Sequence, residues 1–177
     1  MLELEKYTED DEALYSQLVF NEQTMNMNLG RVFTENEASL FFQMMLRCNR
    51  EDPDLGYYKV FARRGEDRSY IGMGALNWND DDHAVEIEYM LLPAYWHQGN
   101  GTELVRLLLQ MANQARQEPD VVAITDPENV YSKRLLQRAG FSLVRQYVND
   151  DGDPAELYIK RAEHAGRSHA SDKRQGT

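Results

Sequence analysis

The sequence predicts one mixed α/β domain whose sheet is antiparallel in its first half, then holds a central parallel strand pair with a crossover helix, and closes with a C-terminal β-hairpin. Its 177 residues, 42% of them apolar, suit a single domain with a substantial buried core. Three short segments rich in β-branched and aromatic residues occupy the middle of the chain, separated by polar turns. A helical pattern then leads into an apolar run, an order typical of a βαβ unit. We expect residues 1–160 to form this domain and residues 161–177, which have almost nothing to bury, to form a flexible tail.

The first third of the chain predicts a strand followed by two helices. Residues 2–7 alternate apolar and polar side chains, which indicates a strand. Each helix begins with a capping-box sequence, and we expect the helices over about residues 8–20 and 34–49. The capping pairs are Thr8 with Asp11 and Thr34 with Glu37. The polar, methionine-containing residues 21–33 are then expected to form the loop between the helices.

The remainder of the chain supplies the rest of the sheet. The three middle strands should form an antiparallel meander, followed by a helix with one apolar face over residues 103–116. The apolar run at residues 120–126 is expected to lie parallel to the strand before that helix, because a crossover helix returns the chain in the same direction. A helix that ends at Gly140 and a hairpin complete the fold. The meander strands are expected at residues 57–64, 70–78 and 85–92, the last helix at 127–140, and the hairpin strands at 141–148 and 155–161.

A polar hinge with two glycines joins the third meander strand to the helix after it, in the stretch YWHQGNGTELVRLLL, Tyr95–Leu109. In a strand–loop–helix unit the loop N–H groups and the first helical turn face one point, where the positive end of the helix dipole attracts an anion. Gly99 and Gly101 would let the backbone approach a phosphate closely. A loop that only turns the chain also accommodates two glycines, so the hinge alone leaves both interpretations open. Its spacing fits neither a Walker loop nor the three-glycine dinucleotide fingerprint.

Composition narrows the classes of partner. The net charge of −11 and the pI near 4.8 argue against a nucleic-acid backbone, which requires clustered Lys and Arg, and fit either a cationic partner or a well-solvated surface. Four histidines and one cysteine lack metal-ligand spacing, so no metal is expected. With one cysteine, no signal-peptide pattern and no apolar run of about 20 residues, we expect a cytoplasmic protein that does not enter the membrane. We expect it to be a monomer or a homodimer.

Two stretches, VEIEYMLLPAYWHQGNGTELVRLLLQMA and DPENVYSKRLLQRAGF, resemble the GNAT superfamily of acyl-CoA-dependent N-acetyltransferases, and most closely its Rim-like branch of ribosomal-protein N-terminal acetyltransferases. The resemblance is most specific over Val85–Phe141, and the order of strands and helices agrees with the family's fold. The family's pyrophosphate motif, Gln/Arg-x-x-Gly-x-Gly/Ala, falls on residues 96–101. Trp96 departs from the motif at its first position, as is common in Rim-like members.

This resemblance implies acetyl-CoA as the cosubstrate and assigns residues to it. The pantetheine arm would pair with the strand backbone near Met90, Leu91 and Leu92. Asn129 matches the family's asparagine that hydrogen-bonds the same arm. The residues that would hold the pyrophosphate are those of the hinge and the first helical turn: His97, Gln98, Gly99, Asn100, Gly101 and Thr102.

Acetyl transfer to an amine requires a base for the nucleophile, donors for the thioester oxygen and a proton for the leaving thiolate. Glu86 and Glu88 alternate with apolar residues and so share one strand face. Glu86 matches the position of the family's general base, and Glu88 is the alternative. Leu136 occupies the position at which many family members have a tyrosine that acts as the general acid. The resemblance therefore leaves Ser132, Tyr131 or water to assist the thiolate, with Ser132 as the first choice.

In this family the acceptor site lies between the loop joining the first two helices and the loop of the last hairpin, here residues 21–33 and 149–153. Asp150, Asp151 and Asp153 would attract a cationic amine, although an ordinary polar turn also explains them. The leading hypothesis is direct transfer, in a ternary complex, to a primary amine such as a peptide N-terminus, a polyamine or another small amine. The alternatives are a non-catalytic acyl-CoA-binding regulatory module, suggested by the missing tyrosine, and an acidic interaction domain with a vestigial loop.

Overall fold

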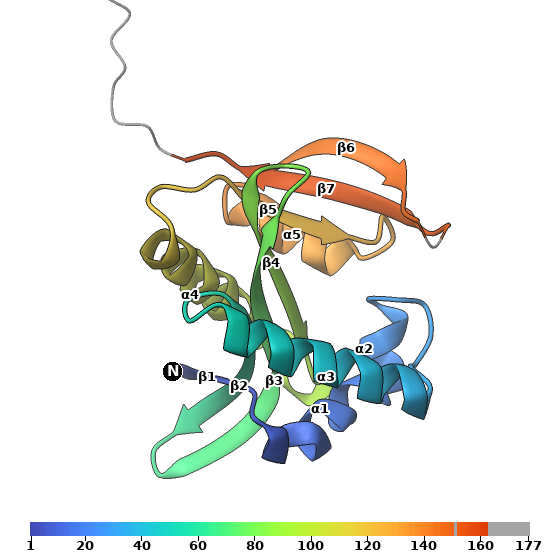
Figure 1. The fold of residues 1–177 in the computed structure, drawn as a ribbon, viewed down its shortest axis with the longest axis vertical. Helices are drawn as coiled ribbons and strands as arrows, with labels where there is room; N and C mark the ends of the chain where they lie inside the picture. The colour runs from blue at the N-terminus through green and yellow to red at the C-terminus, as the bar shows by residue number, and fades with distance from the viewer. Residues whose placement is uncertain (151, 163–177) are drawn as a thin grey trace, which may run out of the picture.

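One seven-stranded sheet, in the order β1-β2-β3-β4-β5-β7-β6, forms the centre of the computed structural model, which describes residues 1–150 and 152–162 (Figure 1). Neighbouring strands run antiparallel except β4 and β5, which are parallel. The predicted fold class is therefore confirmed. The strands are β1 (Leu2–Lys6), β2 (Gly56–Arg64), β3 (Asp67–Asn79), β4 (Ala84–Leu91), β5 (Val121–Thr125), β6 (Ser142–Val148) and β7 (Pro154–Lys160). The helices are α1 (Glu12–Val19), α2 (Glu22–Asn26), α3 (Glu35–Glu51), α4 (Asn100–Ala115) and α5 (Val130–Arg138), with 3₁₀ turns η1 (Glu9–Asp11) and η2 (Pro93–Tyr95).

Helix α3 begins where its capping box predicts. The Thr34 hydroxyl accepts from the Glu37 N–H at 3.2 Å, and the Glu37 carboxylate accepts from the Thr34 N–H at 2.8 Å. The segment expected to be a loop, residues 21–33, contains the short helix α2 instead. Asn21 starts α2 by accepting a 3.0 Å hydrogen bond from the Thr24 N–H. A helix of five residues is too short to show an apolar period in the sequence, which is why the pattern did not predict it.

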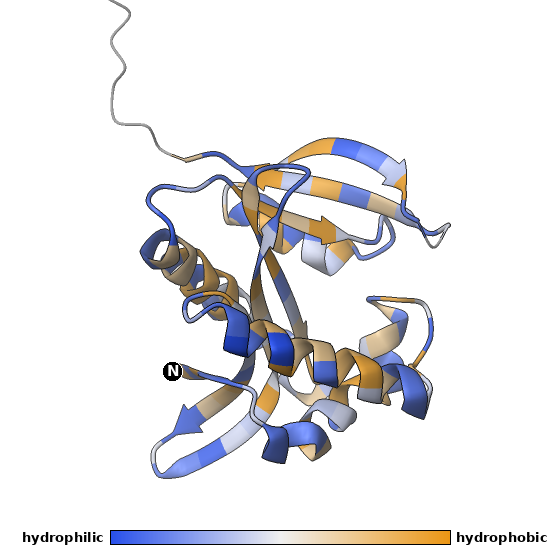
Figure 2. Ribbon diagram, viewed as in Figure 1, coloured by the Kyte–Doolittle hydropathy of each residue, from blue (hydrophilic) through white to orange (hydrophobic). Residues whose placement is uncertain are grey.

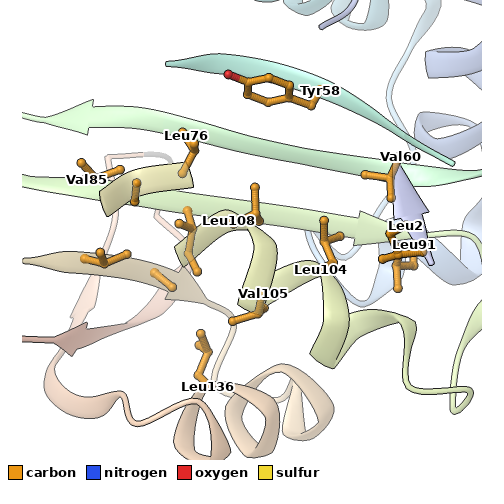
Figure 3. Packing of buried hydrophobic residues seen from close by; sticks show 14 of the residues in the cluster. Leu2, Tyr58, Val60, Leu76, Val85, Leu91, Leu104, Val105, Leu108 and Leu136 are labelled. Carbon is orange, nitrogen blue, oxygen red and sulfur yellow. The ribbon is translucent and has the colours of Figure 1, made fainter. Parts of the chain in front are cut away.

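Two apolar layers hold the helices against the sheet, and Figure 2 shows that both the helices and the strands carry apolar as well as polar residues. Helix α4 packs Leu104, Val105 and Leu108, each at most 1% exposed, against the strands and against Leu136 of α5 (Figure 3). Burial of one such side chain stabilises the fold by roughly 1.5–3 kcal/mol. The opposite face is covered by α1 and α3, and its core includes Tyr15, Leu18, Phe42, Met45 and Met73.

The parallel pair β4–β5 opens soon after it begins. The two strands are in register only at Val85 with Val121 and Glu86 with Val122. Strand β3, by contrast, accompanies β4 along its whole length. Beyond Glu86, one edge of β4 therefore has no strand beside it, and a wedge opens in the middle of the sheet close to the start of α4.

Two expectations concern residues that the structure does not describe. Of the predicted tail, only Arg161 and Ala162 belong to the described residues, and Asp151 of the acidic hairpin loop also lies outside them. Among the helices that are described, none is both long and apolar enough to span a bilayer.

Candidate active site

A cavity of about 630 Å³ occupies the wedge between β4 and β5. Residues 87–91 of β4 form one wall and residues 124–126, at the end of β5, form the other. The start of α4 and one side of α5 line it as well, and Met27 and Asn28, which follow α2, border it from the other face of the sheet. The cavity thus passes through the sheet, with α4 and α5 on one side and the α2 segment on the other.

The backbone of β4 alternates between its two neighbours. The Val85 N–H donates to the Asp120 carbonyl on the β5 side at 3.0 Å, whereas the Leu92 N–H donates to the Ile71 carbonyl on the β3 side at 2.8 Å. Because successive residues of a strand direct their backbone groups to opposite neighbours, residues 87, 89 and 91 face the wedge, and residues 88, 90 and 92 face β3.

This alternation changes the assignment of backbone groups to a pantetheine arm. Of the three predicted positions, Leu91 faces the wedge, while Met90 and Leu92 are turned to β3. Tyr89, which the sequence did not single out, faces the wedge with Leu91. The Leu91 carbonyl already accepts the Trp96 indole N–H at 2.7 Å, so the departure from the family motif at Trp96 has a structural role.

The loop before α4 is held by its own side chains. Gln98 Nε2 donates to the Ala94 carbonyl at 2.7 Å, and Asn100 Nδ2 donates to the Tyr95 carbonyl at 2.9 Å. Neither of these two side chains lines the cavity, although His97 does, with its ring edge-on to Tyr131 at 4.9 Å. Any contact that Gln98 and Asn100 make with a phosphate would therefore come from their backbone N–H groups.

The first turn of α4 opens onto the cavity. Gly99, with φ +83°, is the N-cap, and it lines the cavity together with Gly101 and Thr102. The first N–H groups of a helix have no acceptor within the helix, and the helix dipole adds positive potential there. A Cβ on Gly101 would lie 2.8 Å from Leu135 Cδ1, so glycine allows α5 to pack close to this helix end. The arrangement suits a pyrophosphate.

One of the two strand carboxylates reaches the cavity. Glu88 lines it and accepts a 2.6 Å hydrogen bond from Asn77 Nδ2, whereas Glu86 lies outside and accepts a 2.8 Å bond from Asn79 Nδ2. Burial, followed by the nearby Glu86 carboxylate, raises the pKa of Glu88 to about 7, and hydrogen bonds with Asn77 and Tyr57 act in the other direction. Burial also raises the pKa of Glu86. The geometry therefore favours Glu88, the second choice from the sequence, as the carboxylate that meets a ligand.

Asn129 lines the cavity, but both ends of its amide are engaged within the protein. Its Oδ1 caps α5 by accepting from the Ser132 N–H at 3.1 Å, and its Nδ2 donates to the Met27 carbonyl at 2.8 Å. Contact with a pantetheine arm would have to replace the bond to Met27. Asn129 thus connects the α2 segment to the start of α5.

Ser132 has a partner that sequence reasoning missed. Its Oγ lies 2.9 Å from Tyr89 Oη, and both residues line the cavity. The strand alternation puts Tyr89 on the face opposite Glu86 and Glu88, but nothing in the sequence connects it with Ser132, 43 positions later. Leu136, by contrast, is fully buried in the core, so its position provides no proton donor.

Two hydrogen bonds join the ends of the acidic hairpin loop. The Asn149 N–H donates to the Asp153 carbonyl at 2.9 Å, and the Asp153 N–H donates to Asn149 Oδ1 at 2.8 Å. Asp150 and Asp153 are exposed and do not line the cavity. Within residues 1–150 and 152–162, no three His, Cys, Asp or Glu side chains are grouped as ligands for a metal.

A helix end that attracts anions, strand edges without a neighbour and a half-buried carboxylate of raised pKa all meet in one cavity. Together they suit a site that holds an anionic ligand beside a proton acceptor. Residues 1–142 match the family model described as an acetyltransferase (GNAT) domain. The chain belongs to this family of acetyl-CoA-dependent acetyltransferases.

Solved structures share the fold across nearly the whole chain. A GNAT-family acetyltransferase from Bacillus anthracis is 18% identical with a TM-score of 0.73, covering 90% of this chain and 94% of its own. The ribosomal L7/L12 α-N-protein acetyltransferase RimL in complex with coenzyme A is 19% identical, with a TM-score of 0.72 and coverages of 91% and 94%. Spermidine N-acetyltransferase from Vibrio cholerae, in complex with CoA and spermine, is 15% identical, with a TM-score of 0.71 and coverages of 91% and 95%. Identities this low show a common fold and do not select an acceptor.

Proposed function

We propose that this protein moves the acetyl group of acetyl-CoA to a primary amine by direct attack within a ternary complex. The proposal is carried by one observation: the N-terminus of α4 and Glu88, whose pKa is raised to about 7, open onto the same cavity. The helix end supplies donors for a pyrophosphate, and the carboxylate supplies a base suited to neutral pH.

The cosubstrate would lie along the wedge. The N–H groups of the α4 start, at Asn100, Gly101 and Thr102, would receive the pyrophosphate. The unpaired backbone edge at Tyr89 and Leu91 would accept the pantetheine arm as an additional strand, because amide groups of that arm match a strand's donors and acceptors. RimL and spermidine N-acetyltransferase, which share this fold, were solved in complex with CoA, and this supports CoA as the ligand.

The base and the thiolate donor for acetyl transfer would then lie on opposite faces of β4. Glu88 points to the face of α2, where it would accept a proton from the incoming amine as nitrogen bonds to the acetyl carbon. Tyr89 points to the opposite face and reaches Ser132, whose hydroxyl would donate to the sulfur as the C–S bond breaks. Successive residues of one strand thus place the base and the thiolate donor on opposite sides of the reacting carbon.

The acceptor would enter beside the α2 segment, from which Met27 lines the cavity with Met73 and Met90. Thioether side chains adapt to varied apolar shapes, and Glu88 favours an amine over an acidic group. The related folds of RimL and spermidine N-acetyltransferase are named for a protein N-terminus and a polyamine, so we keep a peptide N-terminus, a polyamine and other small amines as the acceptor class.

Two measurements test the proposal. Acetyl-CoA at 100 times its dissociation constant should stabilise the fold by about 2.7 kcal/mol and raise the thermal midpoint. Release of free thiol in the presence of a broad amine panel should exceed the rate without amine. Stabilisation with no amine-dependent thiol release would point instead to the non-catalytic acyl-CoA-binding module, and no stabilisation at millimolar acetyl-CoA would contradict both.

A further inference from the structure

We propose that Tyr89 is a positioning residue that directs the Ser132 hydroxyl at the leaving thiolate. The inference rests on the proposed acetyl transfer and adds to it a residue from β4 that takes over the task of the absent tyrosine in α5. The observation that carries it is the 2.9 Å contact between Tyr89 Oη and Ser132 Oγ within the cavity wall.

The two hydroxyls come from different elements and meet across the wedge. Tyr89 belongs to β4, and its ring packs against the core beneath α4 and α5. Ser132 stands in the first turn of α5, where its N–H is already fixed by the Asn129 cap at 3.1 Å. Because the cap fixes the serine backbone, the contact with Tyr89 is what sets the direction of the serine hydroxyl.

Acidity determines which hydroxyl donates. A phenol is a much stronger acid than an aliphatic alcohol, so the favoured arrangement has Tyr89 Oη–H donating to Ser132 Oγ. The serine O–H is then left to donate into the cavity. Burial raises the pKa of Tyr89 to about 12, so the phenol keeps its proton throughout the range in which an enzyme would be assayed. A donor that is itself hydrogen-bonded in this way is polarised and donates more strongly.

The transfer step forms one bond to the acetyl carbon and breaks another. The amine nitrogen forms a bond to the acetyl carbon, its proton passes to the Glu88 carboxylate, and the C–S bond breaks with its electron pair on sulfur. The Ser132 O–H, aligned by Tyr89, hydrogen-bonds the thiolate as it leaves, and water then relays the proton taken up by Glu88 to the sulfur, which makes the free thiol and restores the carboxylate. Neither hydroxyl loses its proton, which agrees with the high pKa of the phenol.

The structure also explains why such a pair is needed here. Leu136, one turn further along α5, is fully buried against α4 and takes no part in the cavity. Tyr131 is 59% exposed and its ring contacts His97, so its hydroxyl is not directed by a comparable partner among the described residues. Tyr89 is the tyrosine whose hydroxyl is hydrogen-bonded to the predicted thiolate donor.

Tyr89→Phe tests the inference, because it removes one oxygen and keeps the packing of the ring. We expect kcat to fall about tenfold, the loss associated with a weakened hydrogen bond to a charged group, while KM for acetyl-CoA changes little. The kcat of Ser132→Ala should fall at least as far, and the kcat of the double variant should fall no further than that of Ser132→Ala alone. Tyr7→Phe is the matched control, since it removes a tyrosine hydroxyl contact that is slightly shorter, 2.7 Å to Tyr70 Oη, and lies away from the cavity.

A second readout does not depend on turnover. Free CoA bound to the wild-type protein should show a thiol pKa below that of CoA in solution, followed by thiolate ultraviolet absorbance during a pH titration. Tyr89→Phe should raise that pKa towards the solution value, and desulfo-CoA, which lacks the sulfur, should give no titration. A merely structural role of Tyr89 would not move it.

The outcomes separate this inference from the proposed function. Wild-type kcat together with a wild-type thiol pKa in Tyr89→Phe would overturn the inference and leave acetyl transfer standing. A wild-type protein that transfers acetyl to no amine would overturn the proposed function, and the bound-thiol titration would still decide the role of Tyr89. A third outcome would assign the tyrosine to stability and overturn the inference. In that outcome the thermal midpoint falls in Tyr89→Phe but not in Ser132→Ala, and Ser132→Ala keeps the wild-type thiol pKa.

Discussion

At the scale of single residues, the surroundings of Glu88 affect both the stability of the fold and the proposed chemistry. Its carboxylate is half-buried beside Glu86, and desolvation and the neighbouring charge both favour the protonated form, while Asn77 and Tyr57 favour the charged form. The result is a pKa of about 7. A general base with a pKa near the working pH is deprotonated in a large share of the molecules and still accepts a proton readily. Glu86 shares the strand face and the raised pKa but not the cavity.

Glu88→Gln should therefore remove the base and lower kcat by about 10²–10⁴. In the wild-type protein kcat/KM should rise with pH through about 7, as the carboxylate loses its proton, and this rise should vanish in the variant. Glu86→Gln is the matched control: it neutralises the neighbouring carboxylate outside the cavity and should lower the pH midpoint, because it removes a charge that raises the pKa of Glu88. If Glu86→Gln instead lost the activity and the pH dependence, while Glu88→Gln only shifted the pH midpoint, the base would be Glu86.

The same carboxylate should reduce stability above neutral pH. A folded-state pKa of about 7, against the ordinary 4.5, means that the folded protein binds the proton more tightly than the unfolded chain. The stabilisation is complete below about pH 4.5 and is lost as pH rises through about 7, with an upper bound of about 3 kcal/mol. Glu88→Gln should therefore raise the free energy of unfolding at pH 8 relative to wild type and change it little at pH 4.5. Equal changes at both pH values in denaturant titrations would contradict this.

At the scale of elements, the contact between α4 and α5 shapes the anion-binding end of α4. Gly101 lies in the first turn of α4, and Leu135 from α5 both packs against it and lines the cavity. The close approach is a packing requirement and is independent of backbone strain, since the positive φ belongs to Gly99. The two hinge positions therefore require glycine for different physical reasons.

Gly101→Ala should separate binding from stability. Alanine gains up to about 1 kcal/mol in helix propensity, which offsets much of the cost of displacing the flexible end of Leu135. The displaced side chain should enter the cavity, and we expect the dissociation constant for acetyl-CoA to rise about tenfold, measured by calorimetry, with the thermal midpoint nearly unchanged. Leu135→Ala in the same chain should restore affinity, and a double variant that stays as weak as Gly101→Ala would show that the contact is not the cause.

Elements were predictable where a local pattern specifies them. The capping box of α3, the apolar face of α4 and the βαβ order each follow from neighbouring residues and are present in the structure, although α4 begins at Asn100, ahead of the expected residue 103. Helix α2 was missed because its five residues are too few to show an apolar period, so that the Asn21 cap is its main local signal. The site divides in the same way. Gly99 and Gly101 follow from local spacing, but the pairing of Tyr89 with Ser132 and the choice of Glu88 over Glu86 depend on how distant elements pack.

At the scale of the whole molecule, the short β4–β5 pairing divides the sheet. Strands β1–β4 and strands β5–β7 are each antiparallel, and between them only two positions of β4 and β5 are in register. The apolar layer under α4 and α5 joins the two parts on one face, where Leu136 meets residues of α4 (Figure 3). A cosubstrate in the wedge would contact both parts, and its binding energy would then add to their association.

Amide exchange measured residue by residue should show this bridging. The N–H groups of Tyr89 and Leu91 face the wedge, so acetyl-CoA should slow their exchange strongly, together with those of Asn100–Thr102 at the start of α4. Met90 and Leu92 are directed to β3, where the Leu92 N–H is already bonded to Ile71 at 2.8 Å, and they should change far less. Amides of β5 and β7 should also slow, although they are not expected to contact the ligand, because opening of the second part of the sheet becomes costlier by the binding free energy. Protection of Met90 in preference to Tyr89 would show that the arm lies on the other edge of β4. Protection confined to α4, with β5 and β7 unchanged, would show that the ligand binds the helix end without joining the two parts.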